Sequence, residues 1–290
     1  MLKRSLLLLF FAGLLISQNA FGKEGGDQYP LGAENFLAGM LPPPGTYFIN
    51  YFGFYTGKLL DGNGKEVPGV KAQATIDAMR FAHVTTQKIF GGDWGMHMIV
   101  PFIHQNIDTP AGRNTANGMG DITIDPFVLA WHKPQLHIFT GLDITFPTGS
   151  YDSSTPLKNL GSNFRSYMPV LAFTYLEKGG FEGSVKFMYN VKDKNNDTNY
   201  QSGNEFQLDY LLAKHVKEWA YGLGGFFLQQ TQDDKLNGVD IGNRGKVFAV
   251  GPHIDYNYHG RNFILTWAHE TNVENRFSGE KIFFKYVMRF

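Results

Sequence analysis

The chain divides into short segments in which apolar and polar residues alternate, and this division constrains the fold more than any other feature. From Gly45 onward the alternation is interrupted at intervals by Gly, Asn, Asp and Pro, the residues typical of turns. Twelve segments follow one another, at about 45–57, 72–90, 93–108, 119–132, 135–148, 163–177, 180–192, 203–217, 219–232, 245–258, 261–271 and 280–290. A period of two is the pattern of a β-strand whose two faces have different surroundings. The sequence therefore predicts an all-β fold of about twelve strands.

The breaks between these segments alternate between long and short. Short breaks such as Lys133-Pro134 and His259-Gly260 alternate with long polar ones such as SYDSSTPLKNLGS, and the last break, TNVENRFSG, is intermediate. Transmembrane β-barrels have this asymmetry, with tight turns on the periplasmic side and longer loops outside. A soluble sandwich has no reason to sort its loops in this way. We expect one transmembrane antiparallel β-barrel over residues 45–290, with both ends of the barrel chain on the periplasmic side.

The two faces of several segments differ as lipid and lumen would require. In 203–214, Phe206, Leu208, Tyr210 and Leu212 share one face, and polar side chains share the other. Apolar side chains toward lipid and polar ones toward the lumen give this pattern. A soluble, lipocalin-like barrel with its apolar face inward would also alternate, and some segments, such as GMHMIVPFIHQ, alternate poorly.

Charged residues on the polar faces are candidates for the lumen. They are Asp121, Asp125, Asp143, Arg165, Glu205, Asp209 and Asp255, with Arg80 and Lys186 as further counterions. Opposed charges across a lumen would select among small solutes. They could equally form salt bridges that merely fill the interior. Aromatic residues near the first strand, among them Tyr47 and Phe54, could line a ligand slot or form the interfacial girdles of a barrel.

The last segment, KIFFKYVMRF, places apolar side chains on every second position up to Phe290. In lipid a sheet must close, so a final strand has to pair with the first. Outer-membrane barrels commonly end in such a strand with a terminal Phe, a motif thought to be read by the barrel assembly machinery. Tyr286, Met288 and Phe290 are therefore candidates for an assembly signal.

The first 44 residues do not share the strand pattern. Residues 1–22 have two basic residues, a short apolar run and the small residues of a cleavage site, so they are predicted to be a signal peptide for export. Residues 23–44 form an N-terminal segment that ends at three consecutive prolines. Its apolar residues Leu31, Phe36, Leu37 and Met40 would contact the lumen if the segment plugs the barrel. The alternative is a periplasmic tail or a leader to the first strand.

Composition and motifs exclude several other classes. The chain has no Cys, so no disulfide framework holds it together. Lys plus Arg equals Asp plus Glu at 26 each, which gives no electrostatic reason to expect nucleic acid as a partner. There is no G-x-S-x-G or H-E-x-x-H motif, and the nine His have no metal-ligand spacing. We expect neither an enzyme nor a bound cofactor or metal.

Several stretches resemble the family of the MetA pathway of phenol degradation. They are EGGDQYPLGAENFLAGMLPPPGTYFINYFGFYTG, MGDITIDPFVLAWH, FPTGSYDSSTPLKNLGSNFRSYMPVLAFTY and YLLAKHVKEWAYGLGGFFLQQTQDD. The resemblance implies an outer-membrane barrel that passes small hydrophobic or aromatic compounds. Its partners would be outer-membrane lipids, the assembly machinery and those solutes. The alternative function is a structural or surface-interaction barrel with a closed lumen.

Overall fold

The computed structural model describes residues 28–290, so the predicted signal peptide, residues 1–22, lies outside the described residues. Sixteen strands and one short 3-10 helix, η1 (Pro156–Lys158), occur in this part of the chain. The strands are β1 (Gly45–Leu60), β2 (Glu66–Ile89), β3 (Gly92–Thr109), β4 (Gly112–Met119), β5 (Ile122–His132), β6 (Leu136–Phe146), β7 (Ser166–Leu176), β8 (Phe181–Lys192), β9 (Tyr200–Gln201), β10 (Glu205–Val216), β11 (Trp219–Gln230), β12 (Asp234–Leu236), β13 (Val239–Gly242), β14 (Lys246–Tyr258), β15 (Arg261–Glu274) and β16 (Arg276–Arg289).

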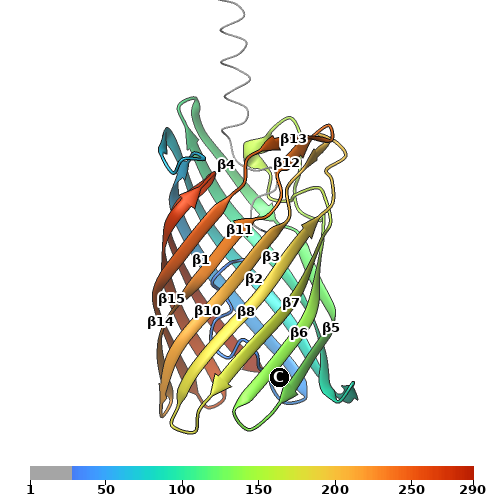
Figure 1. The fold of residues 1–290 in the computed structure, drawn as a ribbon, viewed down its shortest axis with the longest axis vertical. Coiled ribbons are helices and arrows are strands. Elements are labelled where there is room, and N and C mark those ends of the chain that lie inside the picture. Colours follow the sequence, from blue (N-terminus) through green and yellow to red (C-terminus); the bar gives the residue numbers. More distant parts are fainter. Residues whose placement is uncertain (1–27) are drawn as a thin grey trace, which may run out of the picture.

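The long strands close into a single antiparallel barrel (Figure 1). Each strand pairs with its neighbour in the chain, and β16 returns to pair with β1, with Tyr51 opposite Lys285. β4 and β5 both pair with β3, so together they take one position in the wall. In the part of the chain described, the wall thus has twelve positions, and the predicted fold class is confirmed. Closure pairs the backbone groups that would otherwise be exposed at a sheet edge.

The connections lie at two different ends of the barrel. We call the end with the connections at 90–91, 133–135, 177–180, 217–218 and 259–260 the turn end, and the opposite one the loop end. Three of the breaks at the loop end, two long ones and the intermediate one, are instead strand extensions closed by tight turns. The stretch TPAGRNTANG belongs mostly to the β3–β4 hairpin, and LLDGNGKEVPGVK and TNVENRFSG extend their strands in the same way. Polar residues are compatible with a strand once it has left the lipid, so composition alone did not distinguish hairpin from loop.

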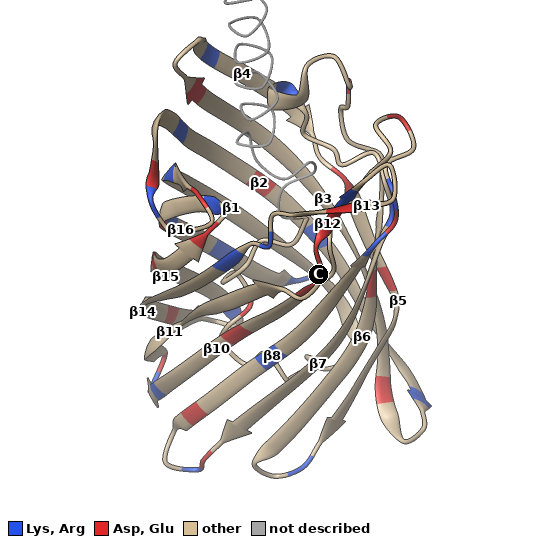
Figure 2. Ribbon diagram, turned by 45° about the horizontal axis from the view of Figure 1, so that its top comes forward, with Lys and Arg blue, Asp and Glu red and all other residues tan. Residues whose placement is uncertain are grey.

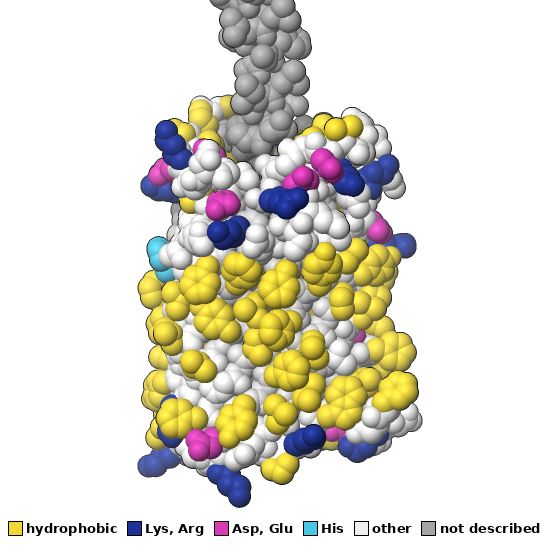
Figure 3. All heavy atoms as spheres, in the orientation of Figure 1, with side chains coloured by type: hydrophobic (Ala, Val, Ile, Leu, Met, Phe, Trp, Pro, Cys, Tyr) yellow, Lys and Arg dark blue, Asp and Glu magenta, His cyan; other side chains and the backbone are white. Residues whose placement is uncertain are grey.

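The outer face carries the apolar side chains that the alternation predicted. Leu212 is 71% exposed, whereas Asp209 on the opposite face of β10 is only 1% exposed. Figure 3 shows hydrophobic side chains gathered in a broad band across the face in view, with charged side chains mainly above and below it. Near the turn end Trp219 stacks on Tyr256, with ring centroids 4.4 Å apart. This belt is the surface that a transmembrane barrel presents to lipid.

The aromatic residues of β1 divide between the two faces. Phe52 and Phe54 are exposed on the belt, as girdle residues are. Tyr47 and Tyr51 are buried instead. The hydroxyl of Tyr51 bonds to Glu34 of the N-terminal segment, so this side of β1 faces the lumen.

The buried core lies inside the barrel, between its wall and the N-terminal segment. Three clusters of buried apolar side chains each contain residues of this segment together with wall residues. Figure 1 shows the segment, in blue, coiled within the ring of strands. Among residues 28–290, no helix is both long and apolar enough to cross a membrane.

Candidate functional site

The site is the lumen, and its main occupant is the segment from Gln28 to Pro44. The segment makes turns rather than a regular helix, for example with Ala33 N donating to Pro30 O at 3.1 Å and Met40 N donating to Leu37 O at 2.8 Å. Pro residues at both ends remove backbone donors and prevent a longer helix. Residues 33–40 therefore form isolated turns.

The first anchor of the segment is Asp209 on β10. Its carboxylate accepts a hydrogen bond from Tyr29 Oη at 2.8 Å and another from Gly32 N at 3.0 Å. Lys186, opposite Asp209 on β8, donates to the same Tyr29 oxygen at 3.1 Å. Figure 2 shows the acidic and basic positions midway along these two strands. Hydrogen bonds to charged groups are the stronger kind, and here they fix one end of the segment.

The second anchor is Glu34, a charged residue of the segment itself. Arg80 Nη1 lies 2.6 Å from one carboxylate oxygen, and Lys285 Nζ lies 2.9 Å from the other. The hydroxyl of Tyr51 also bonds to this carboxylate. Arg80 comes from β2 and Lys285 from β16, on the two sides of β1. Glu34 thus joins the segment to the place where the barrel closes.

The third anchor holds the middle of the segment against the far wall. Leu37 N donates to Glu182 Oε1 at 2.6 Å, and Gly39 N donates to Thr174 Oγ1 at 2.9 Å. At position 39 a Cβ atom would overlap the Thr174 backbone, so only glycine allows this approach. The segment therefore has polar contacts with opposite sides of the wall.

Apolar side chains of the segment fill the space between these anchors. Leu31 and Phe36, two of the predicted plug residues, are buried, and they join different clusters of luminal side chains. Gly32 packs against the ring of Phe226 so closely that a Cβ atom would overlap it. Leu37 and Met40 are partly buried. Two of the four candidates thus belong to the apolar core of the lumen.

Five of the seven predicted luminal charges are buried inside the barrel. Asp209 holds Tyr29, as described above, and Glu205 pairs with Lys192 at 2.7 Å. Asp255 accepts two hydrogen bonds from Asn262, at 2.9 and 3.0 Å. Asp125 and Asp143 lie beside His97. These five residues thus all lie inside the barrel, but they belong to separate contacts and form no single site.

Asp121 and Arg165 occupy other surroundings. Asp121 accepts hydrogen bonds from Gly149 N at 3.0 Å and Ser162 N at 2.8 Å, so it binds the connection between β6 and β7. Arg165 is exposed and lies over the ring of Phe146, 6.0 Å from its centroid. The structure places Arg165 outside the lumen, because the residue precedes β7 and follows the long connection whose register the alternation does not fix.

Several residues of the site were missed from the sequence, although some carried a signal. Glu34 is the sole charged residue between Tyr29 and Pro44 in the sequence, and a lone charge in an apolar segment indicates a specific partner. Lys285 alternates with the apolar residues of the last strand, which places it on the inner face. His97 lies in the segment GMHMIVPFIHQ, where the alternation is poor and gave no such indication.

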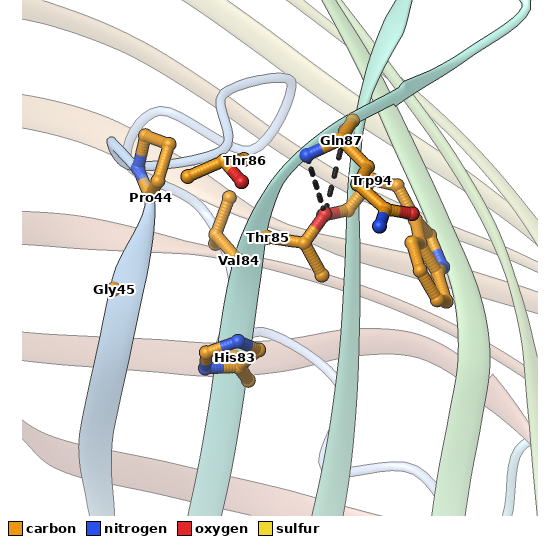
Figure 4. A pocket seen from close by; sticks show the side chains of 8 residues that line it. All are labelled: Pro44, Gly45, His83, Val84, Thr85, Thr86, Gln87 and Trp94. Atoms are coloured by element: carbon orange, nitrogen blue, oxygen red, sulfur yellow. Dashed lines mark hydrogen bonds between the residues drawn. The ribbon is translucent and has the colours of Figure 1, made fainter.

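A cavity of about 390 Å³ lies at the turn end, beside the junction of segment and barrel. Figure 4 shows its lining, which comes from Pro44, Gly45 and the end of β2, with Trp94 of β3. Thr85 accepts a hydrogen bond from Gln87 N at 3.1 Å, within an irregularity of the β2–β3 pairing. Pro44 O accepts from Arg289 Nη2 at 2.7 Å. The junction is therefore fixed to the wall while space remains beside it.

The predicted assembly residues lie on the final strand beside β1. Tyr286 and Met288 are partly exposed and Phe290 is 71% exposed, with its backbone N donating to Thr46 O at 3.0 Å. Their side chains share the face that alternates with Phe283 and Lys285. Their role in assembly stays a prediction.

Taken together, the closed wall, the outer apolar belt and the occupied lumen define the class of transmembrane β-barrels. The model of the family described as "Putative MetA-pathway of phenol degradation" matches residues 56–286, and the chain belongs to this family. The match covers most of the described chain, and the resemblance noted from the sequence is confirmed.

Solved structures share the fold at low sequence identity. The COG4313 outer membrane channel from Pseudomonas putida F1 aligns with a TM-score of 0.78 and 16% identity, over 91% of this chain and 100% of that one. The beta domain of the Bordetella autotransporter BrkA aligns with a TM-score of 0.50 and 9% identity, over 85% and 100%. No match was found among the curated proteins. At these identities the likeness establishes the fold.

Proposed function

We propose that the protein is an outer-membrane channel for small solutes, and that its N-terminal segment closes the lumen and leaves it to open the path. The observation that carries the proposal is the position of residues 28–44 across the lumen, with anchors on opposite sides of the wall. A solute crossing the barrel has to pass this segment. The solved channel from Pseudomonas putida F1 has the same fold, which supports the choice of a channel.

The contacts of the segment suit a movable element. It forms no β-ladder with a wall strand in the described part of the chain, and there is no Cys to tie it covalently. Its polar anchors are a handful of hydrogen bonds and ion pairs, each contributing about 1–3 kcal/mol net. The wall strands are paired with each other without the segment. The segment can therefore leave the lumen without opening the barrel.

Small hydrophobic or aromatic compounds are the solutes that this lumen suits best. Displacing the segment would uncover Phe226, which packs in one cluster with Leu31 and against Gly32. It would also uncover Tyr51 and Phe283, which pack with Ala33 of the segment. Apolar surfaces with a few polar groups bind small organic molecules. The description of the family, which names phenol degradation, supports the same class.

The second candidate is a structural or surface-interaction barrel with a closed lumen. Buried polar contacts near the loop end favour it. Asp234 is fully buried and accepts hydrogen bonds from Gly203 N at 2.8 Å and Gln230 Nε2 at 2.7 Å, which joins β12 to the wall. The strands β9, β12 and β13 form a small sheet at this end. In this alternative both the sheet and the segment are permanent closures.

We infer that the protein is not an enzyme under either candidate function. Ser184 is a buried hydroxyl beside a His–carboxylate pair, but the order of the groups is wrong for nucleophilic catalysis. Ser184 Oγ donates to Glu182 at 2.5 Å, and His215 Nε2 lies 2.6 Å from the other oxygen of the same carboxylate. A catalytic base must lie between the nucleophile and the acid. Here the carboxylate lies between serine and histidine.

The location and partners follow from the same proposal. Export by residues 1–22 and recognition of the last strand by the assembly machinery would deliver the barrel to the outer membrane of a Gram-negative cell. The apolar belt would then contact outer-membrane lipids. Fractionation of expressing cells tests this location, with the protein expected in the outer membrane and a soluble periplasmic protein contradicting it.

Uptake into proteoliposomes tests the channel and its solutes. The refolded mature chain is incorporated, folding is verified by the shift in gel mobility on heating, and uptake is measured for phenol- and toluene-like compounds beside sugars and amino acids of similar size. We expect selective uptake of the aromatic compounds. Equal uptake of all solutes would indicate a general pore, and no uptake above protein-free liposomes would favour the closed barrel.

A further inference from the structure

A cluster of three buried side chains lies on adjacent strands of the wall, beside Arg80 of the second anchor. It consists of His97 on β3, Asp125 on β5 and Asp143 on β6, with exposed fractions of 6%, 1% and 5%. One nitrogen or oxygen atom from each lies within 4.8 Å of the others. His97 is the direct partner of Asp125 across the β3–β5 pairing. Strand geometry therefore brings these three groups together.

An irregularity in β5 shapes this cluster. The β5–β6 pairing jumps from Ile124 opposite Ile144 to Leu129 opposite Thr140, so β5 carries one extra residue, as in a β-bulge. Asp125 lies at its start, before Pro126, and one of its oxygens accepts from Phe127 N at 2.8 Å. A Cβ atom at Gly141 would overlap the other oxygen. The bulge and this glycine thus make room for a carboxylate.

In the described part of the chain, the atoms that face one another in this cluster make no hydrogen bond of good geometry. Within residues 28–290, none is found for Asp125 Oδ2, Asp143 Oδ1 or His97 Nε2, although the last two lie 3.0 Å apart. The nearby cations have other partners: Arg80 and Lys285 bind Glu34, and Lys186 binds Tyr29. Two adjacent buried carboxylates without a bonded cation are costly, and a bound metal ion would offset that cost.

We propose that His97, Asp125 and Asp143 bind a divalent transition-metal ion such as Zn²⁺ or Mn²⁺. One imidazole nitrogen with two carboxylate oxygens is a ligand set for these ions, whereas Ca²⁺ and Mg²⁺ are bound mainly through oxygen. Metal–ligand bonds of about 2.1 Å bring tetrahedral ligand atoms to about 3.4 Å from one another. The three side chains therefore rotate toward each other on binding.

Binding at His97 changes the contacts of Arg80. Arg80 Nη2 lies 2.9 Å from His97 Nδ1, and because a guanidinium only donates, the hydrogen of the neutral ring is on Nε2. Ligation through Nε2 moves this hydrogen to Nδ1, so Arg80 releases His97 and keeps Glu34, 2.6 Å from its Nη1. The metal site and the N-terminal segment thus share one arginine.

Titration of the refolded, chelator-treated chain in detergent tests the site. Zn²⁺ and Mn²⁺ binding is measured by calorimetry, and Co²⁺ absorbance reports the ligand set. We expect one high-affinity ion per chain, with affinity lowered about 100-fold in Asp143→Asn and His97→Gln. The matched control is Asp255→Asn, which neutralises another buried luminal carboxylate and should bind as the wild type does.

Folding of each variant is verified by heat-shifted gel mobility. Gly141→Ala provides a second approach, because it keeps all three ligands but displaces Asp125, and it should also weaken binding. Binding that is equal in wild type and all variants would place the ion elsewhere, for example at the exposed pair His132 and His137, and would overturn the proposal. Absence of stoichiometric binding would also overturn the proposal, and it would indicate that the two carboxylates share a proton instead.

Discussion

The hydroxyl group of Tyr29 donates a hydrogen bond of 2.8 Å to Asp209, a residue 180 positions further along the chain. The contact lies inside the barrel and is buried. It joins the N-terminal segment to β10, and Lys186 of β8 approaches the same hydroxyl. Tyr29 precedes the first barrel strand in the sequence, yet its side chain is buried in the lumen, so this contact holds the segment across the path of a solute.

Tyr29→Phe should loosen the segment while leaving the barrel intact. The variant removes one hydroxyl and leaves buried Asp209 and Lys186 each without one partner, at a cost of about 1–3 kcal/mol to the docked state. We expect faster proteolysis within residues 28–44 and more frequent channel openings in planar bilayers. Tyr189→Phe is the control, because its hydroxyl makes an exposed contact with Thr231. Equal proteolysis in both variants would contradict the role of Tyr29.

Glu34→Gln should change ion selectivity. Arg80 and Lys285 then lose their carboxylate partner, and the net charge of the lumen becomes more positive by one. The loss of these charged contacts weakens docking of the segment by about 1–3 kcal/mol. We expect more frequent openings and a reversal potential shifted toward anions, measured under a salt gradient.

The control for this charge change is Glu66→Gln. Glu66 is exposed and pairs with Lys58 at 2.9 Å, away from the lumen, so its loss should leave the reversal potential unchanged. Equal shifts of the reversal potential in the two variants would mean that Glu34 does not set ion selectivity through its charge in the lumen.

Gly39→Ala tests the segment without changing charge. A Cβ atom at this position would overlap the Thr174 backbone and His137 O, so the segment cannot keep its contact with β7. We expect conductance to rise as in the charge variant but with unchanged selectivity. Gly179→Ala, in a turn where a Cβ atom meets ordinary contacts, should conduct as the wild type does. A closed channel in Gly39→Ala would show that this contact does not hold the segment.

Deleting Phe290 should reduce assembly of the barrel in cells while leaving the stability of the folded barrel nearly unchanged. The ring is 71% exposed, and the residue contributes one backbone hydrogen bond to Thr46, so the folded barrel should lose no more than about 1–2 kcal/mol. If Phe290 is part of an assembly signal, the amount of protein in the outer membrane should fall several-fold in cells, while refolding in detergent stays near normal. Parallel losses in both assays would assign it a structural role only.

The face of each strand was predictable because a period of two is a local property and lipid admits only apolar side chains. Asp209 and Leu212 illustrate this, since their opposite surroundings follow from sequence spacing alone. The partners of Glu34 were not predictable, because Lys285 is 251 positions away and the pairing depends on closure of the barrel. The bulge at Asp125 was also missed, because Pro126 interrupts a ladder whose register no local pattern fixes.

Conductance of a chain lacking residues 29–42 shows whether the N-terminal segment closes the lumen. This deletion removes the three anchors but keeps Pro43 and Pro44, whose carbonyls bind Tyr47 and Arg289 of the wall. We expect a folded barrel with a large, steady conductance in planar bilayers, where the full chain is mostly closed. A deletion variant that is folded by gel mobility yet conducts no better than the full chain would contradict the gate and favour a closed barrel.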